Sequence, residues 1–406
     1  MVVIRPSTWL VLATTCLLAS ANAHAVQVEV TAGEIDYPAG TTLVSYLAPK
    51  GLDPTRRNVV LMSEEGERVV AQRDVTSLSL LHWLLEKPLA AGESRVYEIT
   101  SEIADQSAVP LVKCHSKDDD YEFSIEGKPV LLYNAGVKAC PVKGFEACRR
   151  SGFIHPVYAP DGAVVSDDFP PEHPHQHGIM CAWVDSEFQG KTVDFWNSMK
   201  NQGIIEHSRV NGSVNGPVYG ELDVSLMHSQ ILDEGVKQPV LNELWFVRVY
   251  HSADPYMIDV QSMMACATDK PLHLKEYHYG GMAFRGAREW SFGKAAFLTN
   301  EGKDRESGNH TRPQWTAITG EVDGNTYTVC GVDFPTNFRH PQPVRLHPDM
   351  PYFCWSPSVL GEFEITPGQP YASRYRFFIL KGKPDAEQLD KLQQSAAVPL
   401  VAKLVE

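Results

Sequence analysis

Three histidines are spaced two residues apart in the segment HPHQHG, residues 173–178. Alternate residues of a β-strand share a face, so on a strand His173, His175 and His177 would point the same way. Positions two apart lie about 6.6 Å from each other along a strand. Two neighbouring imidazoles can lean toward one metal ion at that spacing. The pattern predicts a half-site for a divalent metal at His173 and His175, and its third ligand would come from His207, Glu243, His278 or His310.

The same histidines are also suited to proton transfer. Imidazole titrates near neutral pH and acts as a general acid or base at a reacting centre. A downstream carboxylate could orient the ring, while flat aromatic and arginine side chains could bind a sugar and its hydroxyl groups. For this interpretation the predicted catalytic residues are His173, His175, His177, Asp185, Asp194 and His278, and the predicted substrate-binding residues are Trp183, Trp196, Tyr277, Arg285 and Arg312.

A polar loop with solvated histidines is the alternative to a functional site. The whole chain of 406 residues has 15 histidines, and three of them fall within five positions here. That density favours function. Acid–base chemistry is the preferred interpretation, and a divalent metal is the only cofactor that the other interpretation requires.

The first 25 residues predict a secretory signal peptide. They hold one arginine, an apolar run over residues 9–19, and the small residues ANA and AHA, which indicate cleavage after Ala23 or Ala25. The run is shorter than the roughly 20 residues that a membrane span needs, and no later stretch is long and apolar enough to cross a bilayer. We therefore expect a soluble protein that is secreted or periplasmic.

The net charge limits the expected binding partners, and the cysteine content limits the expected disulfides. The chain has 36 basic and 50 acidic residues, a formal net charge of −14, which argues against nucleic acid and anionic membranes as partners. Cys16 lies in the signal peptide, so seven of the 8 cysteines remain, an odd number. Export permits disulfides, and Cys140 with Cys148, in ACPVKGFEAC, is the predicted pair.

The pattern of apolar residues predicts a mainly β fold. Short alternating runs such as VQVEV and SRVYEIT predict a small β-sandwich over residues 26–108, which closes with a linker, ADQSAVP. Longer runs, including GPVYGELDVSLMHSQILD and PYASRYRFFILKG, predict a large antiparallel β-sandwich over residues 109–384. The segment PDAEQLDKLQQSAAVPLVAKLVE predicts a short helical tail over residues 385–406.

Four segments together resemble a secreted bacterial family of unknown function that is labelled PmoA, or methane oxygenase. They are RSGFIHPVYAPDGAVVSDDFPPEHPHQHGIMCAW, DFW, YHYGGMAFRGAREW and GEFEITPGQPYASRYRF, and the resemblance covers roughly residues 113–383. Gln176 stands where the family carries a second adjacent histidine. The family is similar to the galactose-mutarotase-like β-supersandwich, which implies carbohydrate chemistry although a fold does not confer a function. Methane oxidation itself is not expected, because the genuine monooxygenase subunit spans the membrane with several helices.

Three functions are consistent with these patterns. The first is an exported carbohydrate-active enzyme, a hydrolase, lyase or epimerase, that uses His and Asp on a concave sheet. The second is a metal-dependent enzyme with the His-x-His half-site, and the third is a glycan-binding envelope protein without catalysis. The substrate, the identity of the base and the oligomeric state do not follow from the sequence.

Overall fold

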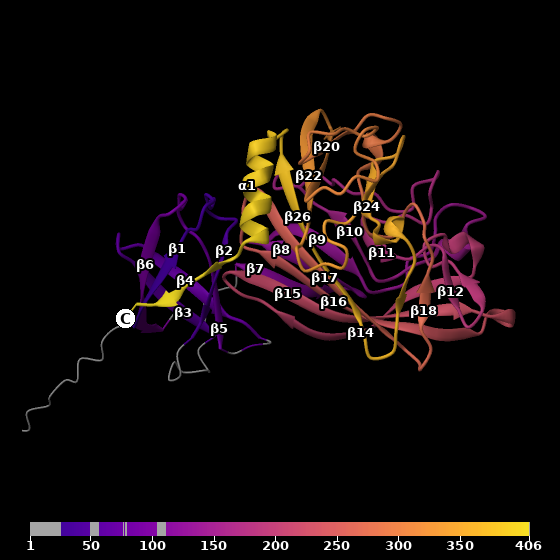
Figure 1. Cartoon of the computed structure of the whole chain (residues 1–406), viewed down its shortest axis with the longest axis horizontal. Helices are drawn as coiled ribbons and strands as arrows, with labels where there is room; N and C mark the ends of the chain where they lie inside the picture. The colour runs from indigo at the N-terminus through magenta and orange to yellow at the C-terminus, as the bar shows by residue number, and fades with distance from the viewer. Residues whose placement is uncertain (1–25, 49–56, 76, 78, 104–110, 406) are drawn as a thin grey trace, which may run out of the picture.

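The computed structural model describes residues 26–48, 57–75, 77, 79–103 and 111–405. The predicted signal peptide, residues 1–25, and the predicted linker ADQSAVP, residues 104–110, lie outside these residues. Strands dominate the described part, and its one α-helix lies near the C-terminus (Figure 1). The mainly β prediction is therefore confirmed. Within the same residues, no helix is long and apolar enough to cross a membrane.

The N-terminal part is one eight-stranded sheet in the order β27-β2-β5-β4-β3-β6-β1-β28. Its alternating side chains enclose a core that includes Trp83 and Tyr97, whose rings meet edge to face at 5.5 Å between centroids. The strands are β1 (Val26–Thr31), β2 (Leu43–Leu47), β3 (Asn58–Ser63), β4 (Arg68–Arg73), β5 (Leu80–Leu84), β6 (Ser94–Ile103), β27 (Leu400–Val401) and β28 (Lys403–Leu404).

The C-terminal tail joins the two edges of this sheet. β27 pairs in parallel with β2, and β28 pairs antiparallel with β1. Ala402 alone separates these two strands, so both edges of the sheet meet at the tail and the sheet wraps around its own core. The predicted helical tail thus consists of one helix, α1 (Ala386–Ala397), followed by two short strands.

Two further eight-stranded sheets and one of four strands form the large sandwich. The first has the order β23-β24-β19-β11-β10-β9-β8-β7, the second β14-β15-β16-β17-β26-β22-β21-β20, and the small sheet β13-β12-β18-β25. All their pairings are antiparallel, which confirms the predicted large antiparallel sandwich.

The elements of the large sandwich have the following bounds. The strands are β7 (Val112–Lys117), β8 (Asp120–Ile125), β9 (Lys128–Asn134), β10 (Phe153–Val157), β11 (Ile179–Ala182), β12 (Ser186–Phe188), β13 (Lys191–Val193), β14 (Gly203–Val214), β15 (Tyr219–Ile231), β16 (Lys237–Tyr250), β17 (Tyr256–Cys266), β18 (Leu272–Leu274), β19 (Gly281–Arg285), β20 (Ala296–Thr299), β21 (Trp315–Val322), β22 (Asn325–Asp333), β23 (Val344–Leu346), β24 (Tyr352–Trp355), β25 (Phe363–Ile365) and β26 (Tyr371–Lys381). Five 3-10 turns, η1 (Glu146–Cys148), η2 (Ser198–Lys200), η3 (Asp233–Gly235), η4 (Arg288–Trp290) and η5 (Pro357–Leu360), lie between them.

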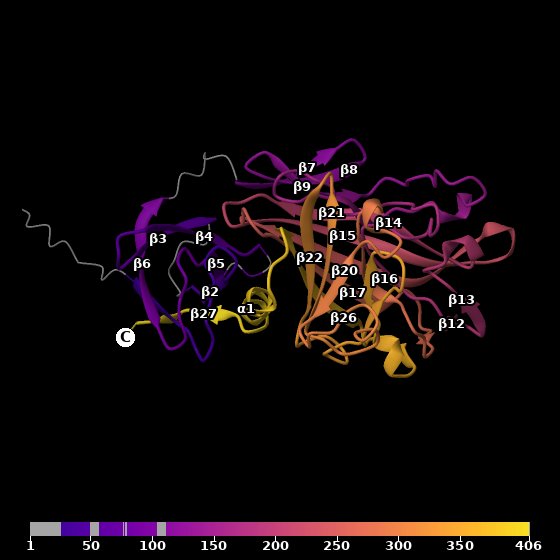
Figure 2. The ribbon, with the colours of Figure 1, turned by 90° about the horizontal axis from the view of Figure 1, so that it is seen from above.

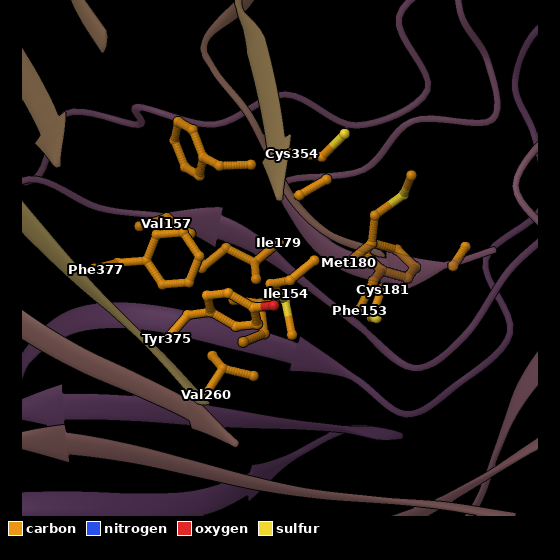
Figure 3. Close-up of a cluster of buried hydrophobic side chains, with 14 of the residues drawn as sticks. Phe153, Ile154, Val157, Ile179, Met180, Cys181, Val260, Cys354, Tyr375 and Phe377 are labelled. Atoms are coloured by element: carbon orange, nitrogen blue, oxygen red, sulfur yellow. The ribbon is translucent and has the colours of Figure 1, made fainter. Parts of the chain in front are cut away.

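The core of the sandwich lies between its two large sheets. Ile154 of β10 and Ile179 of β11 pack there opposite Val260 of β17 and Phe377 of β26 (Figure 3). All four side chains are fully buried. Burial of such aliphatic and aromatic groups stabilises a fold by about 1.5–3 kcal/mol per side chain. This core holds β10 and β11 in place, and the histidine segment precedes β11 directly.

Helix α1 lies between the N-terminal sheet and the large sandwich (Figures 1 and 2). Asp385 caps its N-terminus by accepting the backbone N–H of Gln388 at 2.8 Å. Leu389 and Leu392 are buried against the second large sheet, and Asp390 accepts a hydrogen bond from the indole of Trp315 at 2.7 Å. These contacts fix the helix and so direct the tail toward the N-terminal sheet.

Candidate active site

The three histidines lie in a turn that leads into β11 rather than on a strand. Two successive turns, closed by hydrogen bonds from His173 N–H to Pro170 and from Gln176 N–H to His173, are followed by an isolated bridge between His177 and Asp168. The shared face that a strand would give the three histidines is therefore absent. The following Gly178 is required by packing, because a Cβ there would lie 2.3 Å from the carbonyl oxygen of Ile154 on β10. The turn exposes His173 partly, whereas His175 and His177 are 6% and 1% exposed.

Arg285, the last residue of β19, holds this turn in position. Its guanidinium donates to Oε1 of Gln176 at 2.9 Å and to Oε1 of Glu172 at 2.7 Å, and it contacts Oγ of Ser291 at 3.2 Å. The Arg285 side chain is only 1% exposed. The structure therefore gives this predicted substrate-binding residue three protein partners, two of them in the histidine turn.

A carboxylate not selected from the sequence lies against the innermost histidine. Oδ1 of Asp168 is 2.5 Å from Nδ1 of His177, and the two backbones form an isolated antiparallel bridge. The rings of Phe153 and Phe169 contact the imidazole, with centroids 4.4 and 4.7 Å away. Burial raises the pKa of Asp168 to about 7 and holds the pKa of His177 well below its usual value. Near neutral pH this environment disfavours charge on either partner.

From His175 outward, aromatic and imidazole rings form one continuous series, which we call the ring line. Five segments far apart in the chain contribute to it: the histidine turn, the residues after β13, the residues between β18 and β19, the residues after β23, and β24. Each member contacts the next, with centroid separations of 5.7, 5.3, 5.0, 6.2, 5.4, 4.7 and 4.4 Å. In order, its members are His175, His173, His347, Tyr352, Trp196, Tyr279, His278 and Tyr277.

The imidazoles of the ring line are uncharged at neutral pH. Burial lowers the pKa of His175 and of His347 to about 3, and lowers the pKa values of His173 and His278. Nδ1 of His347 accepts the backbone N–H of Asp349 at 3.2 Å and of Met350 at 3.0 Å. The ring proton of His347 must therefore be on Nε2, which makes that atom a hydrogen-bond donor.

Several buried nitrogens along the ring line have no protein partner in the described residues. They are Nδ1 of His173, Nδ1 of His175, Nε1 of Trp196 and Nε of Arg345. Buried polar atoms are almost always hydrogen-bonded in folded proteins, so such a group points to a missing ligand or water. A cavity of about 560 Å³ is lined by one of these residues, Arg345, by Asn309 and the two chain neighbours of His347, and by the charged residues Asp304, Arg305, Glu306 and Asp349. Its volume is within the range of small-molecule sites.

An exposed aromatic residue comes directly before Gly293, which is hydrogen-bonded to the cavity residue Asp349. Phe292 is 72% exposed and has a φ of +59°, a left-handed backbone conformation that bulky residues rarely adopt. Ser291 before it contacts Arg285, and the N–H of Gly293 after it donates to the carbonyl of Asp349 at 3.0 Å. Phe292 is thus connected on one side to the histidine turn and on the other to the segment of His347.

The other predicted site residues have different surroundings. Asp194 is 1% exposed and accepts from the backbone N–H groups of Trp196 and Asn197 and from Nζ of Lys200, so it shapes the turn that carries Trp196. Asp185 is half-buried, and its carbonyl accepts the N–H of Lys275. The indole of Trp183 is buried and donates to the sulfur of Met264 at 3.1 Å, and Arg312 donates to the carbonyl oxygens of Arg339, His340 and Pro341.

The ligand set of the metal interpretation is not assembled. Among the described residues, no three His, Cys, Asp or Glu side chains are arranged to hold a metal ion. His207 contacts Tyr133, and Nε2 of His310 bonds to the carbonyl of His278. Glu243 is buried in the core, where it accepts hydrogen bonds from His228, Trp245 and Ser262.

The cysteines of the described residues are all free thiols, including Cys140 and Cys148. Burial raises the pKa of Cys148, and the neighbouring Cys140 adds to this shift. The two thiols are thus close enough to interact electrostatically. The disulfide between them stays a prediction.

Comparison with known proteins identifies the family of this chain. Residues 120–394 match a family described as a family of unknown function, DUF6807. The chain belongs to the DUF6807 family. This match spans the histidine turn, the ring line and Asp168, but it does not carry the PmoA label that the sequence resemblance suggested. No curated protein matches the DUF6807 chain.

Several solved structures are similar to this DUF6807 chain. A GH36 alpha-galactosidase from Geobacillus stearothermophilus is 9% identical to this chain and has a TM-score of 0.32. The aligned part covers 66% of this chain and 40% of the galactosidase. A galactose mutarotase related enzyme from Lactobacillus acidophilus is 8% identical, with coverage of 66% and 97% and a TM-score of 0.32. A galactose mutarotase-like protein from Clostridium acetobutylicum is 9% identical, with coverage of 67% and 99% and a TM-score of 0.30. Likenesses this distant do not define an activity.

Proposed function

We propose that this DUF6807 protein is a carbohydrate-active enzyme that transfers protons on an uncharged sugar through histidine side chains. The observation that carries the proposal is the pairing of Asp168 with His177 behind the ring line. A carboxyl group whose pKa is raised to about 7 and an imidazole whose pKa is lowered lie within hydrogen-bond distance. Titratable pairs whose environments move their pKa values in this way are typical of acid–base sites.

The chemistry of the ring line supports an uncharged, hydroxyl-rich ligand. Neutral imidazoles such as His347 and His173 offer hydrogen-bond donors and acceptors without net charge. Ring faces accommodate the apolar C–H face of a sugar, and Phe292, whose neighbour Gly293 is hydrogen-bonded to the cavity residue Asp349, adds an exposed ring. Arg345 and Asn309, which are hydrogen-bonded to each other at 3.1 Å, supply polar groups in the cavity wall.

Each residue has a separate role in this proposal. Asp168 is a positioning residue that orients His177 and does not touch the sugar. His173 and His347 are partly exposed and contact the hydroxyl groups, with Nε2–H of His347 as a donor. His175 precedes His177 by two residues, and its Nδ1 has no protein partner in the described residues. We therefore assign proton transfer, rather than nucleophilic attack, to these histidines.

A two-carboxylate hydrolysis fits the site less well. Such enzymes need one carboxylic acid and one free carboxylate on either side of the bond that breaks. Near the histidine turn, Glu172 is bonded to Arg285, Asp194 to Lys200, and Asp168 to His177. Asp304, Glu306 and Asp349 line the cavity, but Asp168, the carboxyl group whose pKa is raised to about 7, is engaged by His177. We therefore favour epimerisation or elimination over hydrolysis.

A direct test uses the purified protein and a panel of neutral mono- and oligosaccharides. Proton NMR detects changes of configuration, ultraviolet absorbance detects unsaturated products, and a reducing-end assay detects hydrolysis. We expect product in the first or second assay, and we expect His175→Gln to abolish it. Absence of all three kinds of product across the panel would overturn the enzyme proposal, and retained sugar binding would then favour a glycan-binding protein.

The proposal includes export, on the basis of the first 25 residues. N-terminal sequencing of the protein from its native host should begin after Ala23 or Ala25. An intact Met1 on the mature protein would contradict this. Methane oxidation, the activity that the PmoA label names, is not part of the proposal.

A further inference from the structure

Two adjoining cavities lie on the small sheet of the sandwich, apart from the cavity beside His347. Their volumes are about 340 and 330 Å³, and Phe363 and Glu364 of β25 line both of them. The first also contacts β12 and β18, and the second contacts Phe338 and the start of β26. We call the two together the β25 groove.

Aromatic rings form one side of the β25 groove. Phe338 is 41% exposed, and its ring centroid is 5.1 Å from that of Phe363. Phe363 in turn is stacked on Tyr371 at 6.0 Å and an angle of 29°. Trp183 packs edge-on against both of these rings, at 5.6 and 5.2 Å. This tryptophan, predicted to bind sugar, thus supports the groove from the interior instead of presenting its own face.

Four charged residues that line the groove form two pairs. Nζ of Lys275 is 3.2 Å from Glu187, and Nδ1 of His273 is 2.8 Å from Glu364. These pairs join neighbouring strands, since His273 is opposite Glu187 on one side and opposite Glu364 on the other. Glu362 also lines the groove, so carboxylates outnumber cations there, which disfavours an anionic ligand relative to a neutral polyhydroxylated one.

A short stretch of chain links the β25 groove to the ring line. Lys275 lines the groove, and Tyr277, the last member of the ring line, follows two residues later. Tyr277 is fixed there by Ser358, whose carbonyl accepts its N–H at 3.3 Å and whose hydroxyl donates to its carbonyl at 3.3 Å. Two residues of extended chain span about 6.6 Å. That distance is comparable to the length of a sugar unit.

We infer that the β25 groove binds further units of the glycan whose reacting sugar lies on the ring line. This inference rests on the proposed function and deepens it, because it identifies the substrate as a neutral oligosaccharide or polysaccharide rather than a free monosaccharide. Phe338 would pack on a sugar face beside the guanidinium of Arg339, which lies 4.8 Å from its ring centroid. Glu187, His273 and Glu364 would bind hydroxyl groups.

The experiment compares Phe338→Ala with Val137→Ala in the full-length protein. Val137 is 57% exposed and lines neither the ring line nor the groove, so it is a control for removal of an exposed apolar side chain. Binding is measured by native electrophoresis in gels that contain neutral galactan, galactomannan or β-glucan, with anionic polygalacturonate as a contrast. Turnover is measured on neutral disaccharides and on long chains of the same sugars.

We expect at least one neutral polysaccharide to retard the unmodified protein, and Phe338→Ala to weaken that binding about fivefold or more, whereas Val137→Ala should not. KM for long chains should rise by a similar factor, and KM for disaccharides should rise by less. Equal binding by Phe338→Ala and Val137→Ala, or preference for polygalacturonate, would overturn the inference alone if His175→Gln still abolishes turnover. Failure of the unmodified protein in every binding and product assay would overturn the proposed function as well.

Discussion

Oδ1 of Asp168 lies 2.5 Å from Nδ1 of His177, in a place where the carboxylate side chain is 17% exposed and the imidazole is not exposed at all. The two residues belong to one short segment, SDDFPPEHPHQHG, that folds back on itself. Because Nδ1 is engaged by the carboxyl group, the other nitrogen of His177 is left without a protein partner. This is the arrangement that a carboxylate-oriented base requires.

Replacing Asp168 tests whether this orientation matters. In Asp168→Asn the amide NH₂ group can donate to Nδ1 and so favour the other tautomer of His177, and we expect turnover to fall by at least about 100-fold. Asp269→Asn, at a side chain that is 84% exposed, is the control and should leave turnover unchanged. The pH–rate profile shows whether a loss of turnover comes from misorientation of His177 or from unfolding. Misorientation should shift the part of the profile near pH 7, whereas unfolding should lower the rate at every pH.

Removing the arginine that holds the histidine turn should destabilise the protein. Arg285→Leu leaves Glu172 without its cation and Gln176 without its donor, and we expect a loss of about 3 kcal/mol in the free energy of unfolding. Urea denaturation measures it. The same substitution in a Glu172→Gln background should cost less, because no uncompensated carboxylate remains. Identical losses in the two backgrounds would mean that the ion pair does not hold the turn.

Buried histidines should make the protein sensitive to acid. His175 has a pKa of about 3 in the folded protein against 6.5 when unfolded, so the unfolded chain binds a proton that the folded chain does not. Stability is therefore lost as the pH falls from 6.5 toward 3, by about 2 kcal/mol at pH 5 for this residue. Asp168 acts in the opposite sense, because its raised pKa removes stability as the pH rises from 3.8 to about 7. His175→Gln should flatten the dependence of the unfolding free energy between pH 6.5 and 4, and an unchanged slope would contradict the burial argument.

Phe292 should show a conflict between stability and binding. Its φ of +59° costs about 1 kcal/mol in a residue with a Cβ, and glycine avoids this cost. Phe292→Gly should therefore stabilise the protein by about 1 kcal/mol while it weakens sugar binding several-fold. Phe292→Ala keeps the strained backbone and should weaken binding without stabilising. If neither variant changes the sugar affinity, the exposed ring has no part in the site.

The pair Cys140 and Cys148 can be examined chemically. If they form a disulfide in the exported protein, peptide mapping without reductant finds both residues in one linked fragment. Cys140→Ser should then lower the unfolding free energy by about 2 kcal/mol under oxidising conditions and by much less with reductant. Alkylation of Cys140 in the protein purified from its host would contradict the pairing.

The sequence predicted the strand content well because alternation of apolar and polar residues is a local signal. It also singled out His173, Trp196, Tyr277 and His278, which the fold brings into one line of rings. It missed His347 and Tyr352, because their proximity depends on the pairing of β24 with β19 and of β19 with β11. The register of such strand pairs is set by contacts between distant segments, so it cannot be predicted from the periodicity of one segment.

The hydrogen-bond partners of individual side chains could not be predicted from the sequence either. Arg285 could be recognised as a residue able to bind hydroxyl groups, but its protein partners Glu172 and Gln176 become visible only when the turn is folded. Asp168 did have a local signal, since it lies nine residues before His177 in the same segment. A rule that searches for carboxylates just upstream of a histidine cluster would have found it.

The tail that ends in β27 and β28 has a consequence for biosynthesis. The strands β1 to β6 leave the ribosome long before Leu400–Val401 and Lys403–Leu404, the strands that complete their sheet. Until then both borders of that sheet carry open backbone groups, which are prone to intermolecular pairing. The N-terminal part therefore reaches its final form only after translation ends, and a chaperone that shields it meanwhile would raise the yield of folded protein.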